Sequence, residues 1–192
     1  DWVKPGSKVI DIGCAGGYLA PQLVKRGCTV DGIDATPTSE PALRSFYLKD
    51  LNEGLPQIDY SQYDYALMLD VIEHLTRPEA FLDKLRAAMA ANADAEAIVS
   101  TANVGFFVTR LMLFIGQFNY GRRGILDLTH TRLFTFASFA RAVEQSGFQI
   151  LECTGVPGPF ALALGEGTLS RLLYKINRML IGISRGMFSY QI

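Results

Sequence analysis

Short, nearly continuous apolar runs alternate with longer segments of helical periodicity along most of the chain. Residues 9–12 and 63–69 are typical of strands buried on both faces, whereas residues 78–91 repeat apolar side chains every three or four positions, as an amphipathic helix does. Further strands are predicted at residues 28–33, 45–49, 97–101 and 148–153, and further helices at residues 18–26 and 37–44 and after Thr135. This alternation predicts a doubly wound, Rossmann-like α/β sheet of seven strands, in which residues 187–192 form the last, antiparallel strand.

Two apolar segments interrupt this rhythm. Residues 104–127 combine a run of aliphatic and aromatic side chains with a basic, glycine-containing turn, which predicts either a helical lid over an acceptor pocket or a hairpin that enlarges the core. Residues 168–184 repeat apolar side chains at helical spacing, with basic residues between them and no acid from Gly167 onward. This C-terminal amphipathic helix either lies on a membrane or packs on the sheet as a crossover helix.

The turn after the first strand is the main candidate for chemistry. In residues 8–20, KVIDIGCAGGYLA, Gly13, Gly16 and Gly17 allow a tight turn and the close approach of a ligand to a helix N-terminus. The pattern D-x-G-x-x-G-G departs from the dinucleotide pattern G-x-G-x-x-G. Asp11, two residues before the first glycine, favours a ligand with a cationic amine and would repel a phosphate.

A second acid, Asp34, ends the second strand and lies 23 residues after Asp11 in the chain. An acid at this interval typically holds the hydroxyls of a ribose. The chemistry fits any adenosine ribose, so this pair of acids does not choose between nucleotide cofactors. Asn103, after the fifth strand, falls at the sheet edge where open α/β sheets place ligands.

Both histidines of the chain fall in predicted loops at one sheet edge. His74 belongs to D-V-I-E-H-L, residues 70–75, in which Asp70, Glu73 and His74 have the spacing of metal ligands, although we favour packing of His74 against the cofactor. His130, in DLTHTRLFTF, could remove a proton from an acceptor hydroxyl, with Asp127 or Thr129 orienting its ring. Arg132 could pair with an acidic acceptor or anchor the lid.

These motifs together resemble those of class I S-adenosylmethionine (SAM) dependent methyltransferases, in a bacterial subgroup often encoded beside, or fused to, glycosyltransferases of cell-surface glycan synthesis. The resemblance implies SAM as the cofactor, no metal, and methyl transfer to a hydroxyl of a small molecule or a surface-glycan sugar. It implies that Asp50 accepts a hydrogen bond from the adenine amino group. The implied catalytic residues are His130, Glu73 and Arg132, and the implied cofactor-binding residues are Asp11, Gly13, Cys14, Ala15, Gly16, Gly17, Tyr18, Asp34, Ala35, Asp50, Leu51, Leu69, Asp70 and His74.

The sequence departs from the family pattern at Ala15, where many members have another glycine, and in the short region before Asp50. The helix that usually precedes the first strand is also absent, which suggests a part of a longer chain, such as a fusion with a glycosyltransferase. Two alternatives stay open: a nicotinamide-dependent Rossmann oxidoreductase, and a SAM-binding scaffold without catalysis.

Composition bears on the number of domains, on nucleic-acid binding and on the cellular compartment. A length of 192 residues with 49% hydrophobic side chains predicts one domain, and a net charge of −1 argues against a broad nucleic-acid interface. Three cysteines without metal-ligand spacing indicate reduced thiols, as in a cytoplasmic protein; the basic C-terminal helix is the candidate for contact with the inner face of the membrane. Cys14, near a helix N-terminus, could be an acidic thiol, but we favour a small packed side chain.

Overall fold

The computed structural model describes residues 2–192. The chain divides into two compact units, Asp1–Ser100 and Thr101–Ile192, which we describe separately. That one domain spans the whole chain stays a prediction. Within the described residues, no helix is both long enough and apolar enough to cross a membrane.

The first unit is built on a five-stranded, fully parallel sheet with the strand order β3-β2-β1-β4-β5. Each observed strand begins and ends within two residues of a predicted one, because the buried apolar runs mark them clearly. The central strand β1 pairs with β2 on one side and with β4 on the other. The strands are β1 (Lys8–Ile12), β2 (Thr29–Asp34), β3 (Ser45–Leu48), β4 (Tyr65–Leu69) and β5 (Glu96–Ser100).

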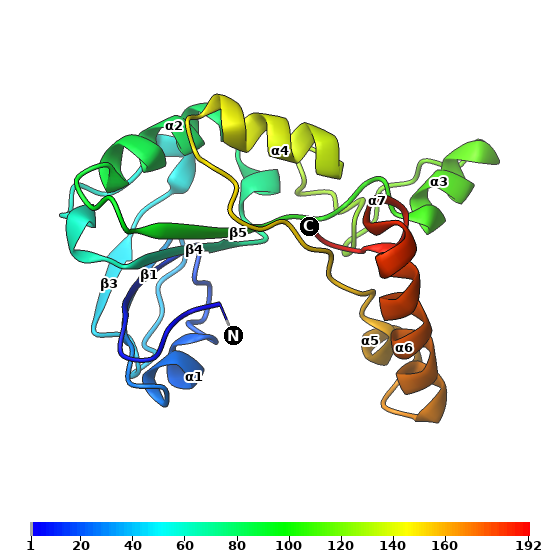
Figure 1. The fold of residues 1–192 in the computed structure, drawn as a ribbon, viewed down its shortest axis with the longest axis horizontal. Coiled ribbons are helices and arrows are strands. Elements are labelled where there is room, and N and C mark those ends of the chain that lie inside the picture. The colour runs from blue at the N-terminus through cyan, green and yellow to red at the C-terminus, as the bar shows by residue number, and fades with distance from the viewer. Residues whose placement is uncertain (1) are drawn as a thin grey trace. The chain divides into compact units, whose positions relative to one another are not determined.

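Helices cover both faces of this sheet, as in a doubly wound fold. Helix α1 (Ala20–Val24) lies on one face and α2 (Pro78–Met89) on the other (Figure 1). Three short 3-10 helices lie in the loops. η1 (Leu51–Glu53) follows β3, η2 (Tyr60–Gln62) precedes β4, and η3 (Ile72–His74) follows β4. The helix predicted at residues 37–44 does not form. Pro41 has no N–H to donate to the carbonyl of Pro37, so this segment cannot close its first helical turn.

A buried carboxylate ties β2 to the loops around it. Asp31 is fully buried and accepts hydrogen bonds from the Tyr63 hydroxyl (2.6 Å) and from Nε of Arg44 (2.9 Å), while a second guanidinium nitrogen of Arg44 contacts its other oxygen. Burial alone would raise the pKa of Asp31, but the bonds from Arg44 and Tyr63 hold it below its ordinary value. Asp31 therefore stays charged inside the unit.

The second unit contains helices α3 to α7 and, among the residues described, no strand of its own. The prediction of a seven-stranded sheet is therefore wrong. The helix predicted after Thr135 forms, and Thr135 is its N-cap: the Thr135 hydroxyl accepts from Ser138 N in a capping box. The helices are α3 (Phe107–Phe114), α4 (Phe136–Gln145), α5 (Phe160–Leu164), α6 (Thr168–Ile183) and α7 (Arg185–Phe188).

The two missing strands have a physical reason. Residues 148–153 lie along the surface, with Leu151 71% exposed, so no apolar face holds them as a strand. Helix α7 extends to Phe188, which leaves only four residues after it. These residues form isolated antiparallel bridges, in which Gln191 pairs with Ala102 and with Val156.

Asn103 was predicted to lie at the ligand-binding edge of the sheet. In the structure, its side chain holds the C-terminal segment in place. Its side chain is fully buried, and its amide nitrogen donates to the carbonyl oxygens of Ser189 (2.8 Å) and Gly186 (3.2 Å). Its amide oxygen accepts from Gly105 N (2.9 Å). These bonds use both groups of the side-chain amide, so Asn103 has a structural role.

Candidate functional site

The glycine turn between β1 and α1 folds back over the end of β2. The backbone N–H groups of Gly13 and Cys14 both donate to the carbonyl oxygen of Ile33, at 2.7 and 3.1 Å. Gly13 and Gly17 have φ of +78° and +74°, values that favour glycine. A Cβ on Gly13 would lie 2.3 Å from a methyl of Val71, so this side chain fills the space that glycine leaves.

Asp34 holds the other side of this turn. Its Oδ2 accepts from Ala15 N (2.8 Å) and its Oδ1 from Thr36 N (2.7 Å). Each carboxylate oxygen can accept a second hydrogen bond, so the half-buried side chain can also accept from the two hydroxyls of a ribose. Ala15 takes a φ of +48°, a left-handed conformation that is uncommon for a residue other than glycine.

Asp11 makes the site electrostatically negative. It lies on the central strand, is only 3% exposed, and has a pKa raised from 3.8 to about 6, first by burial and then by the nearby charge of Asp34. A cationic group placed between the two carboxylates would relieve this cost. The pair therefore favours a ligand with a positive charge.

Asp70 is the third acid at this edge, directly after β4. Its φ of +54° is uncommon for a residue other than glycine, and such strain is often found at functional sites. The Ser100 hydroxyl donates to Asp70 Oδ1 (3.1 Å), and Asp70 N donates to the Ser100 carbonyl (3.2 Å). Ser100 thus positions Asp70, and no sequence motif predicted this role. Because β1 pairs with both β2 and β4, the ends that carry Asp11, Asp34 and Asp70 are adjacent.

The residues predicted around the adenine and the methionine part of SAM vary in exposure. Asp50 is exposed and caps η1, its Oδ1 accepting from Asn52 N (2.8 Å), while Leu51 is buried and Leu69 half-buried. Ala35 is exposed, and so is Tyr18, whose ring lies beside Gly16.

Cys14 contributes its backbone to the turn, and its thiol is not acidic. Its Sγ packs over β2, where a Cβ on Gly32 would lie 2.7 Å from it. Burial, followed by the charges of Asp11 and Asp34, raises the pKa of Cys14 to about 12. The favoured interpretation of a small packed side chain agrees with this environment.

Glu73 and His74 lie in η3, close in sequence to Asp70. Glu73 is 2% exposed and His74 half-buried. Across the described part of the chain, no three His, Cys, Asp or Glu side chains, Asp70, Glu73 and His74 included, are grouped as a metal site. A catalytic role for Glu73 stays a prediction.

His130 and Arg132 belong to the second unit. Nδ1 of His130 lies 2.9 Å from the carbonyl oxygen of Ile125, a partner that the sequence did not indicate. A carbonyl oxygen only accepts, so Nδ1 carries the proton and Nε2 is the basic nitrogen of the neutral ring. Asp127 accepts from the Thr129 hydroxyl (2.6 Å), and Arg132 is exposed.

Curated relatives of this chain are named ubiquinone biosynthesis O-methyltransferases. The protein from Schizosaccharomyces pombe is 27% identical over 74% of this chain and 53% of its own length. That from Methylobacterium nodulans is 28% identical over 77% of this chain and 62% of its own length. The chain thus spans between half and two thirds of these relatives.

Solved structures share the fold at low identity. A SAM-dependent methyltransferase from Archaeoglobus fulgidus matches 98% of this chain and 84% of its own, with a TM-score of 0.57 and 18% identity. The 1,6-didemethyltoxoflavin-N1-methyltransferase of Burkholderia thailandensis, solved with S-adenosylhomocysteine, matches 80% of this chain and 65% of its own, with a TM-score of 0.58 and 19% identity. These likenesses establish a Rossmann-like methyltransferase fold.

The family itself follows from the sequence match. A family model described as a methyltransferase domain matches residues 1–153, which include the whole sheet, the glycine turn and both histidines. Because this match covers well over half of the sequence, the chain belongs to the methyltransferase-domain family.

Proposed function

We propose that this protein transfers the methyl group of SAM to a hydroxyl group. The observation that carries the proposal is the glycine turn bound by Asp34 at the end of β2, with the buried carboxylate of Asp11 on the adjacent strand β1. Membership of the methyltransferase family argues against the nicotinamide oxidoreductase alternative.

The residues at this edge match the parts of SAM. Asp34 would accept from the ribose hydroxyls, and the exposed carboxylate of Asp50 from the adenine amino group. Asp11 would face the positive charge of the methionine part, which lowers the cost of its own ionisation. When bound, SAM supplies a methyl group on a positively charged sulfur, so the protein's main task is to align the acceptor oxygen.

An acceptor hydroxyl is supported by the names of the curated relatives, which are O-methyltransferases of ubiquinone biosynthesis. A phenolic hydroxyl is therefore our first candidate. A sugar hydroxyl of a surface glycan, together with a glycosyltransferase partner, is the second candidate and derives from the sequence resemblance.

We further propose that His130 is the general base. With Nδ1 protonated against the Ile125 carbonyl, Nε2 accepts the hydroxyl proton as the oxygen forms its bond to the methyl carbon. Replacing His130 with Ala should lower kcat by about 10²- to 10⁴-fold and leave SAM affinity nearly unchanged. The matched control is Leu128→Ala, an exposed neighbour in the same loop. Near wild-type kcat in His130→Ala would remove this histidine from the mechanism.

The experiment that tests the function is acceptor screening with a direct product readout. The full chain is incubated with SAM and with pools of catechols, phenols and sugars, and S-adenosylhomocysteine is measured by mass spectrometry. We expect production that depends on a phenolic pool. SAM binding without product in any pool would indicate the scaffold alternative, and product with the sugar pool alone would favour the glycan acceptor.

A further inference from the structure

Helix α6 leaves a row of apolar side chains exposed on one side and buries two polar side chains on another. Ser170 and Asn177 are its buried side chains, at 4% and 3% exposure. The Asn177 amide accepts from Gly158 N (2.9 Å) and donates to the Phe188 carbonyl (2.8 Å), which fixes this face against α7 and the chain before α5. The opposite side carries an apolar row that is 40 to 74% exposed: Leu169, Leu172, Ile176, Met179 and Ile183.

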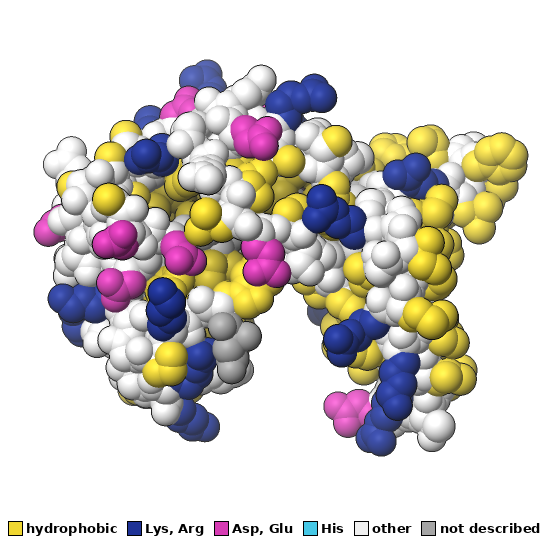
Figure 2. Space-filling model, viewed as in Figure 1, with side chains coloured by type: hydrophobic (Ala, Val, Ile, Leu, Met, Phe, Trp, Pro, Cys, Tyr) yellow, Lys and Arg dark blue, Asp and Glu magenta, His cyan; other side chains and the backbone are white. Residues whose placement is uncertain are grey.

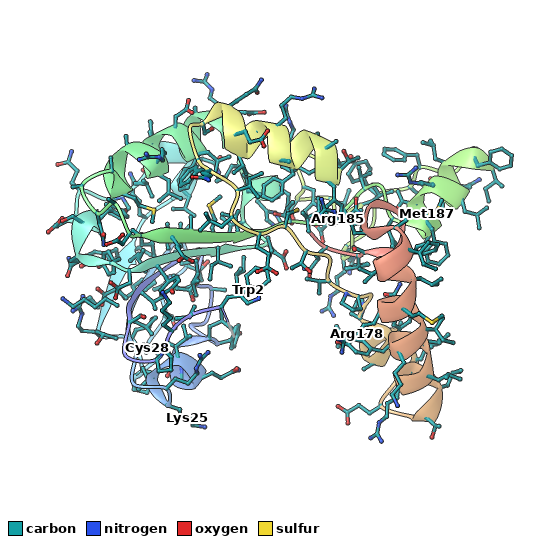
Figure 3. The ribbon with its side chains drawn as sticks, viewed as in Figure 1. Trp2, Lys25, Cys28, Arg178, Arg185 and Met187 are labelled. Carbon is teal, nitrogen blue, oxygen red and sulfur yellow. The ribbon has the colours of Figure 1, made fainter. Side chains whose placement is uncertain are left out.

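Basic side chains line one flank of this row. Arg171, Lys175 and Arg178 recur at three and four residues and therefore form a second stripe along the helix. Figure 2 shows hydrophobic side chains along one edge of α6 and Lys and Arg side chains along the other, and Figure 3 labels Arg178 on this helix. Arg185 differs, because it donates to the Cys153 carbonyl (2.6 Å) and lies over the Phe136 ring.

Helix α3, in the same unit, also combines exposed apolar side chains with nearby basic residues. In and after α3, the side chains of Leu111, Phe114 and Ile115 are 58 to 88% exposed. The surrounding residues 105–126 contain three arginines and no acid. Phe107 of α3 contacts Phe188 of α7, with ring centroids 5.9 Å apart, and α7 in turn packs on α6.

Charge distinguishes this unit from the chain as a whole. Residues 101–192 hold nine Lys or Arg against four Asp or Glu, a net charge of +5, whereas the whole chain has −1. A patch that is both apolar and basic matches the two properties of an anionic lipid surface, which offers an apolar interior behind negative headgroups. A second copy of this chain would bring the same positive charge to the contact and would be repelled.

We infer that the outward face of α6, together with the apolar end of α3, docks on an anionic membrane surface. The helix lies in the plane of the interface, with Leu172, Ile176 and Met179 in the acyl boundary. Its three basic residues contact the headgroups. This inference does not depend on methyl transfer, because it concerns a surface of the second unit alone.

The test is co-sedimentation of the full chain with vesicles, either of phosphatidylcholine alone or with about one third phosphatidylglycerol. We expect binding to the anionic vesicles that weakens as salt rises, and much weaker binding to phosphatidylcholine. Each basic residue near such a surface contributes about fivefold. Replacing Arg171, Lys175 and Arg178 with Gln should therefore lower the binding constant about 100-fold.

Two further variants distinguish docking of this surface on lipid from nonspecific hydrophobic adsorption. Leu172→Gln combined with Met179→Gln should lower binding at least tenfold. Leu151→Gln, at an exposed position of the same unit but outside this surface, should not. Circular dichroism checks that each variant stays folded. Absence of binding to anionic vesicles would overturn the inference. A dimer detected by light scattering and abolished by the Leu172→Gln, Met179→Gln double variant would also overturn it, because a second copy of the chain would then cover the apolar face of α6.

Discussion

Replacing Asp11 with Asn should make the protein more stable at neutral pH and lower its affinity for SAM. Asp11 is 3% exposed, and burial and the charge of Asp34 raise its pKa from 3.8 to about 6. The folded state therefore binds the Asp11 proton more tightly than the unfolded state does. The contribution of Asp11 to stability is therefore greatest below about pH 4, falls as pH rises from about 4 to 6, and is constant above that range.

The size of this effect follows from the shift. A difference of about two pKa units corresponds to about 3 kcal/mol at neutral pH, as an upper value. Asn has no charge to desolvate, so Asp11→Asn should be more stable than the wild type by up to about 3 kcal/mol at pH 8 and by almost nothing at pH 4. SAM affinity at pH 7.5 should fall about tenfold or more, because the ligand's positive charge loses a partner.

Urea unfolding between pH 4 and pH 8 measures the stability difference directly. Trp2 is the only tryptophan in the sequence and belongs to the first unit, so its fluorescence reports on the unit that contains Asp11. Asp83→Asn, at an exposed position on α2, is the matched control and should show no such pH dependence. A stability difference for Asp11→Asn that does not change with pH would refute the reasoning.

Three further predictions concern packing and capping. Gly13→Ala should cost about 2 to 4 kcal/mol of stability, because its Cβ would meet Val71. Gly6 has a similar φ of +80° and open space around it, so Gly6→Ala should cost about 1 kcal/mol. Equal losses of stability in thermal melts of the two variants would contradict this reasoning. Tyr63→Phe should cost about 1 to 3 kcal/mol in urea unfolding, since it removes a buried donor to the charged Asp31, and Tyr60→Phe, which loses only a 3.3 Å bond to Pro56, should cost less. Thr135→Ala should cost about 1 kcal/mol by loss of the α4 cap, and hydrogen exchange in the first turn of α4 that matched the wild type would argue against it.

The sheet and the glycine turn could be predicted from the sequence because their causes are local. Buried parallel strands are short apolar runs, and the glycine positions follow from backbone conformations that other residues avoid. The side-chain contacts around the turn and the site could not be predicted, because they are not local. Val71 fills the space beside Gly13, and Ser100 positions Asp70, yet neither residue belongs to a spacing pattern. The roles of Glu73, His130 and Arg132 stay predictions.

The errors in the second unit have the same origin. Residues 148–153 have the composition of a strand, but a strand needs a neighbour, and the four residues after α7 form only isolated bridges. Likewise, the periodicity of α6 correctly predicted a helix, but periodicity does not reveal which face is buried. The bonds of Asn177 decide that, and they leave the apolar row exposed.

Isothermal titration of the full chain with SAM tests the central claim most directly, with NAD as the competing ligand and Asp34→Ala as the variant. The account predicts a dissociation constant on the order of micromolar for SAM, no binding of NAD, and a 5- to 150-fold loss in the variant, equivalent to about 1 to 3 kcal/mol for ribose hydroxyls left without an acceptor. Binding of NAD without SAM, or equal SAM affinity in Asp34→Ala and the wild type, would contradict it.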